Sequence, residues 1–235
     1  REFLTHTGTL GNQRLTVTST GIGPDNIDIV LNELDALANI DLQTRAIKAK
    51  KRQLRFIRVG TSGSLQPELD VDQFLVSHAA IGLDNLLHYY ADSQAHQDTA
   101  LANSFNALIQ EVAPGLPQAY AFGAAPALTR QFAGPHAAGI TLTAPGFYGP
   151  QGRALRLQSR LHEHFFERIR QFQWAGLKVT NFEMETAALL GLSRLLGHEA
   201  IAVNAILANR PKGTFSDQAH QSVDHLIEWT LEKLQ

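Results

Sequence analysis

Short apolar runs rich in β-branched residues alternate along the chain with longer segments in which apolar residues recur every three or four positions. The first pattern is typical of strands and the second of amphipathic helices. The runs that we predict to be strands are Leu15 to Ser19, Leu54 to Val59, Gln73 to His78, Gly139 to Thr143, Leu177 to Thr180 and Ala200 to Leu207. This alternation favours an α/β fold, and we expect three layers in which helices flank a mixed central sheet.

Two segments carry apolar residues at helical spacing, and each set is expected to face the core. The apolar positions of these segments are Ile27, Val30, Leu31, Leu34 and Leu37, and then Leu189, Leu192 and Leu196. Leu157 to Ala175 and Val223 to Leu234 are further predicted helices. Ala113 to Pro135 carries several Pro, Gly and Ala residues and therefore predicts a long loop.

The composition is that of an ordinary globular protein. Hydrophobic residues make up 44% and charged residues 18% of the chain, whereas disordered chains combine few hydrophobic residues with many charges. A length of 235 residues suits one large domain, and the patterning contains no repeat and no linker. We therefore expect residues 1–235 to form a single domain.

The charges nearly balance, with 20 Lys and Arg against 22 Asp and Glu, so no net field attracts nucleic acid or an anionic membrane. Any anion must be bound by a local site. The one concentrated basic run is Lys48 to Arg52, with Arg45 and Arg55 nearby. Because this run joins a helical pattern to a strand pattern, a solvated connection is favoured over a phosphate or nucleic-acid patch.

The chain has no Cys, which excludes disulfides, thiolate chemistry and the common Cys-type zinc sites. Its longest apolar stretches fall short of the roughly 18 to 20 residues that span a bilayer, and its beginning lacks the apolar core of a signal peptide. We therefore expect a soluble, cytoplasmic protein that binds neither membranes nor nucleic acid.

Ligands of α/β sheets gather beyond the carboxyl ends of strands, and unusual residues follow four of the predicted strands. The first end, Ser19 to Asn26, contains Gly21 and Gly23, which either form a plain turn or let backbone N–H groups approach an anion. The second carries Arg58 in an apolar strand that is expected to end in a Gly-Thr-Ser-Gly turn at Thr61. A buried Arg needs a partner, and two alternatives stay open: a phosphate ligand, or an ion pair with Glu33.

The third end places Phe147, Gln151 and Arg153 in a Gly-Pro loop. A Gln amide and an Arg fork two residues apart match the amide edge of a flat heterocycle, although exposed polar residues in a plain loop are the alternative. The fourth end has Glu183 and Glu185 on either side of Met184. The alternation is expected to point the two carboxylates in different directions. Glu185 either complements a helix dipole or grips sugar hydroxyls, and Met184 either fills the core or lines the sugar pocket.

Taken together, these segments resemble the nucleoside phosphorylase family, with the uridine phosphorylase branch as the closest match. The similarity extends over nearly the whole chain and rests on the order of its motifs. These are Arg1-Glu2-Phe3, Ser19 to Gly23, Arg58 to Gly63, Phe147-Tyr148 with Gln151 and Arg153, Glu183-Met184-Glu185 and Asn209-Arg210. The resemblance implies phosphorolysis of uridine to uracil and ribose 1-phosphate by a pentosyltransferase with a mixed central sheet, assembled as dimers that commonly build a hexamer.

The same resemblance implies roles for individual residues. The implied phosphate ligands are Arg58, Thr61 and, from a neighbouring subunit, Arg1; the implied nucleoside ligands are Phe147, Gln151, Arg153, Glu183, Met184, Glu185 and Arg210. Of these, Arg153, Gln151 and Glu185 are expected to act in catalysis, with Arg210 supporting Arg153 through water. Phosphate is a co-substrate and no cofactor is expected, apart from a candidate monovalent cation site, K⁺ in the structural role, near Glu2 and Ile22.

Comparison with the family also bears on which base is recognised and on how much of the family's N-terminal segment this sequence contains. Purine-specific relatives carry a Ser-Asp pair where this chain has Leu207-Ala208-Asn209-Arg210, so a pyrimidine is favoured. The family also carries, upstream of Arg1, a strand and a Gly-Asp-Pro-x-Arg phosphate loop that this sequence does not contain, and we expect that part of the N-terminus is absent. Phosphorolysis or hydrolysis of another nucleoside, and a non-catalytic nucleoside-binding role, are the alternatives.

Overall fold

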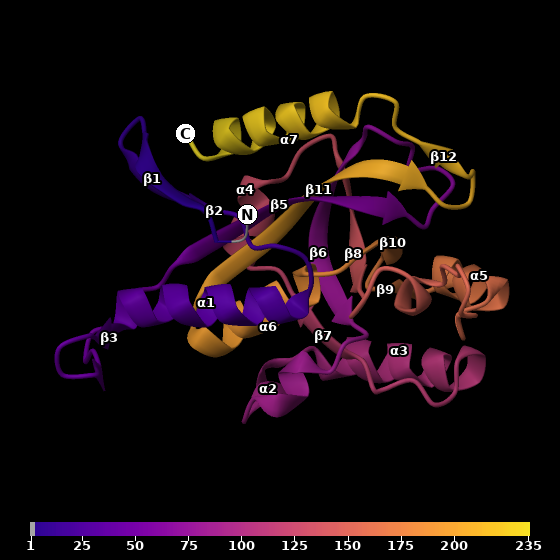
Figure 1. Ribbon diagram of the computed structural model, residues 1–235, viewed down its shortest axis with the longest axis horizontal. Helices are drawn as coiled ribbons and strands as arrows, with labels where there is room; N and C mark the ends of the chain where they lie inside the picture. The colour runs from indigo at the N-terminus through magenta and orange to yellow at the C-terminus, as the bar shows by residue number, and fades with distance from the viewer. Residues whose placement is uncertain (1–2) are drawn as a thin grey trace.

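The computed structural model describes residues 3–235 and shows strands gathered at the centre of the molecule with helices around them (Figure 1). The strands of the central sheet are β5 (Arg55–Ser64), β6 (Phe74–Gly82), β7 (Tyr120–Gly123), β8 (Ala137–Thr143), β10 (Leu177–Glu183), β11 (Glu199–Asn209) and β12 (Thr214–Phe215), with the short β9 (Gln173–Trp174) paired to β10. All six predicted strands are present; five belong to this sheet, and the sixth is β2 (Gln13–Thr18), which forms a separate hairpin with β1 (Thr5–Leu10).

The central sheet closes on itself. Its order is β12-β11-β5-β10-β8-β6-β7, and β11 pairs with β6 as well as with β5. The contact with β5 is parallel and runs from Glu199 beside Arg55 to Asn209 beside Ser64, while the contact with β6 is antiparallel. The mixed sheet is therefore confirmed, and β5, β11, β6, β8 and β10 form a closed circuit that the hydrophobic pattern did not predict.

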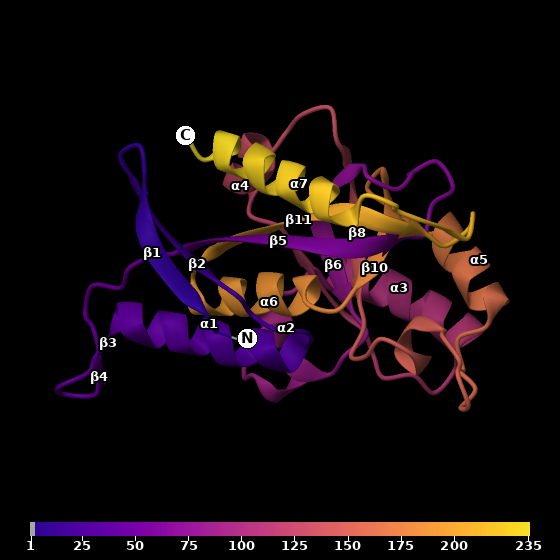
Figure 2. The same ribbon diagram turned by 45° about the horizontal axis from the view of Figure 1, so that its top comes forward.

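Helices cover the sheet on several sides. They are α1 (Pro24–Asn39), α2 (Ser93–His96), α3 (Thr99–Val112), α4 (Pro126–Gln131), α5 (Glu163–Gln171), α6 (Thr186–Leu196) and α7 (Ala219–Lys233). Figures 1 and 2 show α7 on one side of β5 and β11, with α1 and α6 on the other. Apolar side chains of α3 and α5, such as Phe105 and Phe165, bury a second cluster against β8 and β10.

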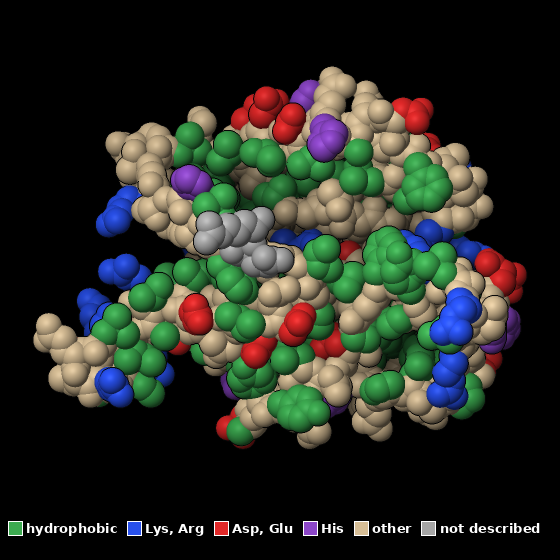
Figure 3. Space-filling view, in the orientation of Figure 1, with side chains coloured by type: hydrophobic (Ala, Val, Ile, Leu, Met, Phe, Trp, Pro, Cys, Tyr) green, Lys and Arg blue, Asp and Glu red, His purple; other side chains and the backbone are tan. Residues whose placement is uncertain are grey.

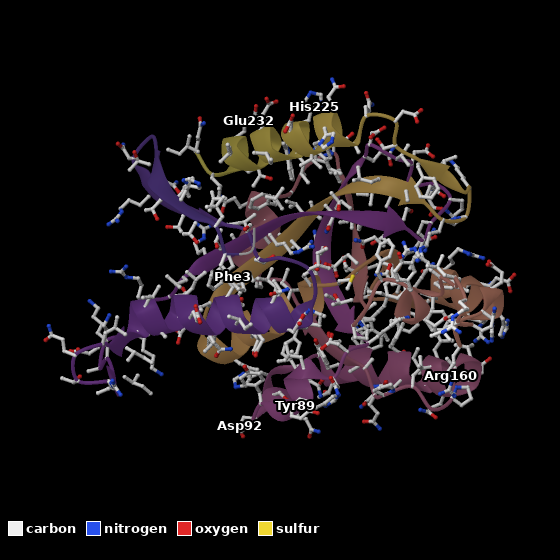
Figure 4. The ribbon with its side chains drawn as sticks, viewed as in Figure 1. Phe3, Tyr89, Asp92, Arg160, His225 and Glu232 are labelled. Atoms are coloured by element: carbon white, nitrogen blue, oxygen red, sulfur yellow. The ribbon has the colours of Figure 1, made fainter. Side chains whose placement is uncertain are left out.

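The amphipathic character of α7 illustrates why these helices dock. Leu226 and Thr230 are buried, whereas His225 and Glu232 are exposed and point away from the sheet (Figure 4). This helix lies where Val223 to Leu234 was predicted. No helix within residues 3–235 combines the length and apolarity needed to cross a membrane.

Three sequence predictions of local structure were wrong. The segment predicted as a loop, Ala113 to Pro135, contains both β7 and α4. The helix predicted over Leu157 to Ala175 covers only Glu163–Gln171 and is followed by β9 (Gln173–Trp174). The strand predicted to end at Val59 continues to Ser64, because β11 pairs with it over that whole length, so no Gly-Thr-Ser-Gly turn forms.

The basic run is exposed, as predicted for a solvated connection. Lys48 to Arg52 follows a short hairpin of β3 (Ile40–Asp41) and β4 (Ala46–Ile47) at the end of α1. Lys48 donates a hydrogen bond of 2.8 Å to the carbonyl of Ala38, near the carboxyl end of that helix. A cation is favourable there because it meets the negative end of the helix dipole.

Candidate active site

Arg58 lies at the centre of a buried charge cluster. Its Nη1 is 3.4 Å from Glu183 Oε2 and its Nη2 pairs with Glu185 Oε2, while only 14% of its side chain is exposed. β5 supplies the Arg, the last residue of β10 supplies Glu183, and Glu185 is the residue that immediately precedes α6. The ion-pair partner suggested from the sequence, Glu33, is wrong, because that residue is exposed on α1.

Gly60, two residues after Arg58, leaves space for the Arg58 guanidinium beside the strand. A methyl group at position 60 would overlap the Arg58 guanidinium, so a Gly at this position allows the side chain to lie against its own strand. The guanidinium meets the end of β10 at Glu183 and the middle of β11 at Asn204. In the orientation of Figure 1, the space-filling view shows a groove above α1 with basic and acidic side chains in its depth (Figure 3).

Glu183 caps the first turn of α6. Its Oε2 accepts hydrogen bonds of 2.9 Å from the backbone N–H groups of Glu185 and Thr186, and its Oε1 accepts one of 2.6 Å from the Thr143 hydroxyl. Free N–H groups at a helix start favour an anion, which explains why a buried carboxylate is tolerated there. The dipole role considered for Glu185 therefore belongs to Glu183.

Glu185 connects the turn before α1 to the cluster. The backbone N–H of Gly23 donates to Glu185 Oε1 at 2.7 Å, and Gly23 has a φ of 103°, a conformation that favours glycine. Burial raises the pKa of Glu185 and the charge of Glu183 raises it further, while Arg58 opposes the shift. Both carboxylates contact one guanidinium, so the expectation that they point in different directions was wrong.

The loop after β8 forms a second part of the site. Arg153 Nη1 donates to Gln151 Oε1 at 2.6 Å and to the carbonyl of Phe147 at 2.7 Å. The guanidinium carbon lies 3.9 Å from the centre of the Phe147 ring, within the range of a cation–π contact. Gln151 is only 2% exposed, whereas Phe147 is 51% exposed. The Gln and the Arg thus hold each other in place beside an accessible aromatic face.

Arg210 lies where the two parts of the site meet. Its guanidinium carbon is 5.1 Å from the Phe166 ring and 5.5 Å from the Phe182 ring, and Phe182 immediately precedes Glu183. Among the described residues its buried Nη2 has no hydrogen-bond partner. Burial lowers the pKa of Arg210 to about 10, with a further contribution from the charge of Arg153, so it is still a cation at neutral pH.

Residues 1–234 of the chain match the model of the phosphorylase superfamily. The chain belongs to this superfamily. It is 31% identical to the uridine phosphorylase of Thermococcus kodakarensis, with 99% of this chain and 74% of the relative aligned. The uridine phosphorylase of Escherichia coli is 26% identical, over 99% of this chain and 79% of its own length.

A solved structure supports the same membership. The nucleoside phosphorylase of Trypanosoma brucei, whose crystal structure is described as showing uridine phosphorylase activity, superposes with a TM-score of 0.83 at 28% identity. The match covers 98% of this chain and 82% of the other. The resemblance to the nucleoside phosphorylases and the α/β fold with a mixed central sheet are thereby confirmed.

Other residues predicted for the site of this superfamily member make none of the ion pairs described above. Thr61 is exposed on β5, and Met184 is partly buried between the two carboxylates. The carbonyl of Ile22, suggested for a monovalent cation, accepts a hydrogen bond of 2.7 Å from Asn26 Nδ2. Arg1 and Glu2 lie outside the described residues.

Sequence reasoning missed Asn204, whose Oδ1 accepts a hydrogen bond of 3.1 Å from Arg58 Nη1. A signal was present, since Asn204 is the one amide in the apolar strand predicted over Ala200 to Leu207. Buried polar groups require partners, so this residue pointed to a neighbour on another strand. Asn209, in contrast, is structural: its Nδ2 donates to the carbonyls of Gln66 and Leu69 at 3.0 and 2.9 Å.

Proposed function

We propose that this protein cleaves the N-glycosidic bond of uridine by phosphorolysis and releases uracil and ribose 1-phosphate. The observation that carries the proposal is that β8 and β10 are neighbouring parallel strands, with Glu183 beside Thr143, so the Arg58 cluster and the loop of the Gln151–Arg153 pair lie at the same edge of the sheet. The naming of several relatives as uridine phosphorylases supports it.

The first group suits phosphate and ribose. Arg58, with Thr61 on the same strand and Arg1 from a neighbouring subunit, would position the phosphate, because a guanidinium fork matches phosphate oxygens. Glu185 would accept hydrogen bonds from the ribose hydroxyls, with Met184 beside the sugar. Glu183 keeps this arrangement in place through its bonds to the start of α6.

The second group suits uracil. Gln151 offers one acceptor and two donors, and Arg153 offers a fixed set of donors, which together match the carbonyl and N–H edge of the base. Phe147 would pack against the base, and Arg210 would reinforce Arg153 through water. On binding, Arg153 would exchange its bond to the Phe147 carbonyl for bonds to the base.

The reaction would proceed by nucleophilic displacement at C1′ of the ribose. A phosphate oxygen forms a bond to C1′ as the bond from C1′ to N1 of uracil breaks, and the bonding electron pair leaves with the base. The sugar acquires oxocarbenium character, and Arg153 with Gln151 stabilises the negative charge that grows on uracil.

The proposal includes an assembly and its ligands. Phosphate would be the co-substrate, and no resident cofactor would be needed. The subunits would associate as dimers or larger assemblies, because Arg1 is assigned to a neighbouring site. A structural monovalent cation near Glu2 and Ile22 belongs to the same proposal, and the protein would act in the cytoplasm.

Uracil release from uridine, measured with and without inorganic phosphate, tests the function. Phosphate-dependent release with formation of ribose 1-phosphate is the expected result. Equal release in both conditions would identify a hydrolase, and no release would favour a non-catalytic binding role. Thymidine, 2′-deoxyuridine and inosine assayed in parallel would reveal a different preferred nucleoside.

A further inference from the structure

Polar side chains that are hydrogen-bonded one to the next form an open ring that passes from strand to strand around the closed circuit. Every strand of the circuit contributes at least one member, and most members are fully buried. The members are Arg58 and Ser62 on β5, Asn204 on β11, Ser77 on β6, Thr141 on β8 and Asn181 on β10. Buried polar groups are costly unless they bond to one another, so this ring requires an explanation beyond packing.

Arg58 determines the direction, from donor to acceptor, of the hydrogen bonds in the ring. A guanidinium only donates hydrogen bonds, so the atom of Asn204 that faces Arg58 Nη1 at 3.1 Å is the carbonyl oxygen. The amide nitrogen of Asn204 therefore points the other way and donates to the Ser77 hydroxyl oxygen at 3.4 Å. The orientation of this Asn is thus determined by the charge of Arg58 on one side and held by Ser77 on the other.

The hydrogen bonds from Ser77 onwards have the same order of donor and acceptor. The oxygens of Ser77 and Thr141 lie 2.6 Å apart, and Thr141 donates to Asn181 Oδ1 at 2.8 Å. Because the Thr141 proton is used in that bond, Ser77 donates to Thr141. Asn181 Nδ2 then donates to the Ser62 hydroxyl at 2.9 Å. The ring ends on β5, next to Thr61 and four residues from its start.

We propose that Asn204 is a positioning residue for phosphate binding, held in place by Ser77 and the rest of the ring; this rests on the phosphate role of Arg58 in the proposed function. Within residues 3–235, the other polar contacts of the Arg58 guanidinium are with Glu183 and Glu185. Without Asn204 it would turn towards the carboxylates, and its fork would no longer face the phosphate. Phosphate recognition by Arg depends on that planar geometry.

Asn204→Ala tests the proposal through two readouts. We expect the Kd of inorganic phosphate, measured by titration calorimetry, and the KM for phosphate to rise about tenfold, as for loss of a hydrogen bond to a charged group. The KM for uridine should change by less than about twofold, because Glu185 keeps its bond from the Gly23 N–H. A purely structural role would alter both KM values together.

Two further variants make the test specific. Ser77→Ala leaves every contact of Arg58 described above in place and removes the hydroxyl that bonds to Asn204 and to Thr141, so it should weaken phosphate binding in the same direction by a smaller factor. Asn39→Ala is the matched control: this buried Asn bonds to the backbone of Arg52 and has no bond to the ring, so phosphate binding should not change.

The outcomes separate this inference from the proposed function. Unchanged phosphate affinity in both Asn204→Ala and Ser77→Ala, or an equal change in the two KM values, would overturn the positioning role. Should Asn204→Ala fail to fold, Ser77→Ala alone decides in the same way. If the unaltered protein binds phosphate but does not release uracil, the proposed function fails, while the Kd of phosphate still tests the role of Asn204.

Discussion

The two parts of the site differ in how they are held. The cluster around Arg58 is carried by β5, by the end of β10 and by the start of α6, and its two carboxylates are almost completely buried. The Phe147 to Arg153 loop is partly open to solvent and satisfies its polar groups by pairing Arg153 with Gln151. Strand ends are fixed by the hydrogen bonds of the sheet, whereas a loop can exchange partners. If the proposed roles hold, the comparison predicts a preformed site for phosphate and sugar and a base site that rearranges on binding.

The largest effect is expected for Arg58→Ala, which removes the cation shared by Glu183 and Glu185. Breaking a buried ion pair leaves uncompensated charge and costs about 3 to 5 kcal/mol, so the free energy of unfolding should fall by that amount, together with a loss of phosphate-dependent activity. Chemical denaturation measures the free energy of unfolding. Arg55→Ala on the same strand is the control, because its 3.5 Å contact with Glu199 is at the surface and worth about 0 to 1 kcal/mol. Equal losses for the two variants would contradict a special role for the cluster.

Arg153→Ala should affect catalysis more than folding. Loss of a donor that stabilises a developing anion costs about 2.7 to 4 kcal/mol, so kcat for uridine phosphorolysis should fall about 100- to 1000-fold. The free energy of unfolding should decrease by only about 1 kcal/mol, for the bond lost by Gln151. Arg168→Ala, which removes a surface pair with Glu111, should leave kcat unchanged. An unchanged kcat in Arg153→Ala would refute the role of this residue at the base.

Glu185→Gln should reduce kcat/KM for uridine at neutral pH by about 10- to 100-fold, since hydrogen bonds to a charged group contribute about 1.5 to 3 kcal/mol. The pH profile is the sharper measurement. Burial raises the pKa of Glu185, so lowering the pH protonates it, and activity is lost, at a higher pH than for an ordinary Glu. The variant should lack this acidic limb. Glu68→Gln, which alters an exposed pair with Lys178, should keep it.

Phe147→Ala should have the smallest effect. The ring is half exposed and contributes a cation–π contact of about 0.5 to 1 kcal/mol with Arg153, so the KM for uridine should rise about two- to fivefold. The thermal midpoint should hardly change. Phe215→Ala removes an even more exposed ring on β12 and serves as the control. A loss of stability in the first variant alone would show that the loop is more rigid than its exposure indicates.

Much of the fold followed from local patterns. All six predicted strands and the helices α1 and α6 are present, because period two and period 3.6 are properties of the backbone itself. Within the predicted apolar face of α1, Leu37 is the exception: it was expected to face the core and is 63% exposed. The elements that were missed are short or depend on long-range pairing. β7, for example, consists of four residues in a segment rich in Pro and Gly, and it is stabilised by pairing with β6.

For the site, the sequence by itself determined which residue types stand at the strand ends. Arg58 was identified from the cost of placing a charge in an apolar strand. Glu183, Glu185, Gln151 and Arg153 were noted because they follow predicted strands, and the family resemblance implied their roles. The roles of the individual residues in substrate binding stay predictions until they are tested as described above.

Only the tertiary structure decided which of these residues meet. Pairing of β11 with both β5 and β6 closes the sheet, and this closure brings Asn204 and Ser77 into one ring with Arg58. Partners separated by more than a hundred residues leave no periodic trace in the chain, since a hydrogen bond depends on distance in space. The sequence therefore specified the polar groups, and the closed sheet specified their partners.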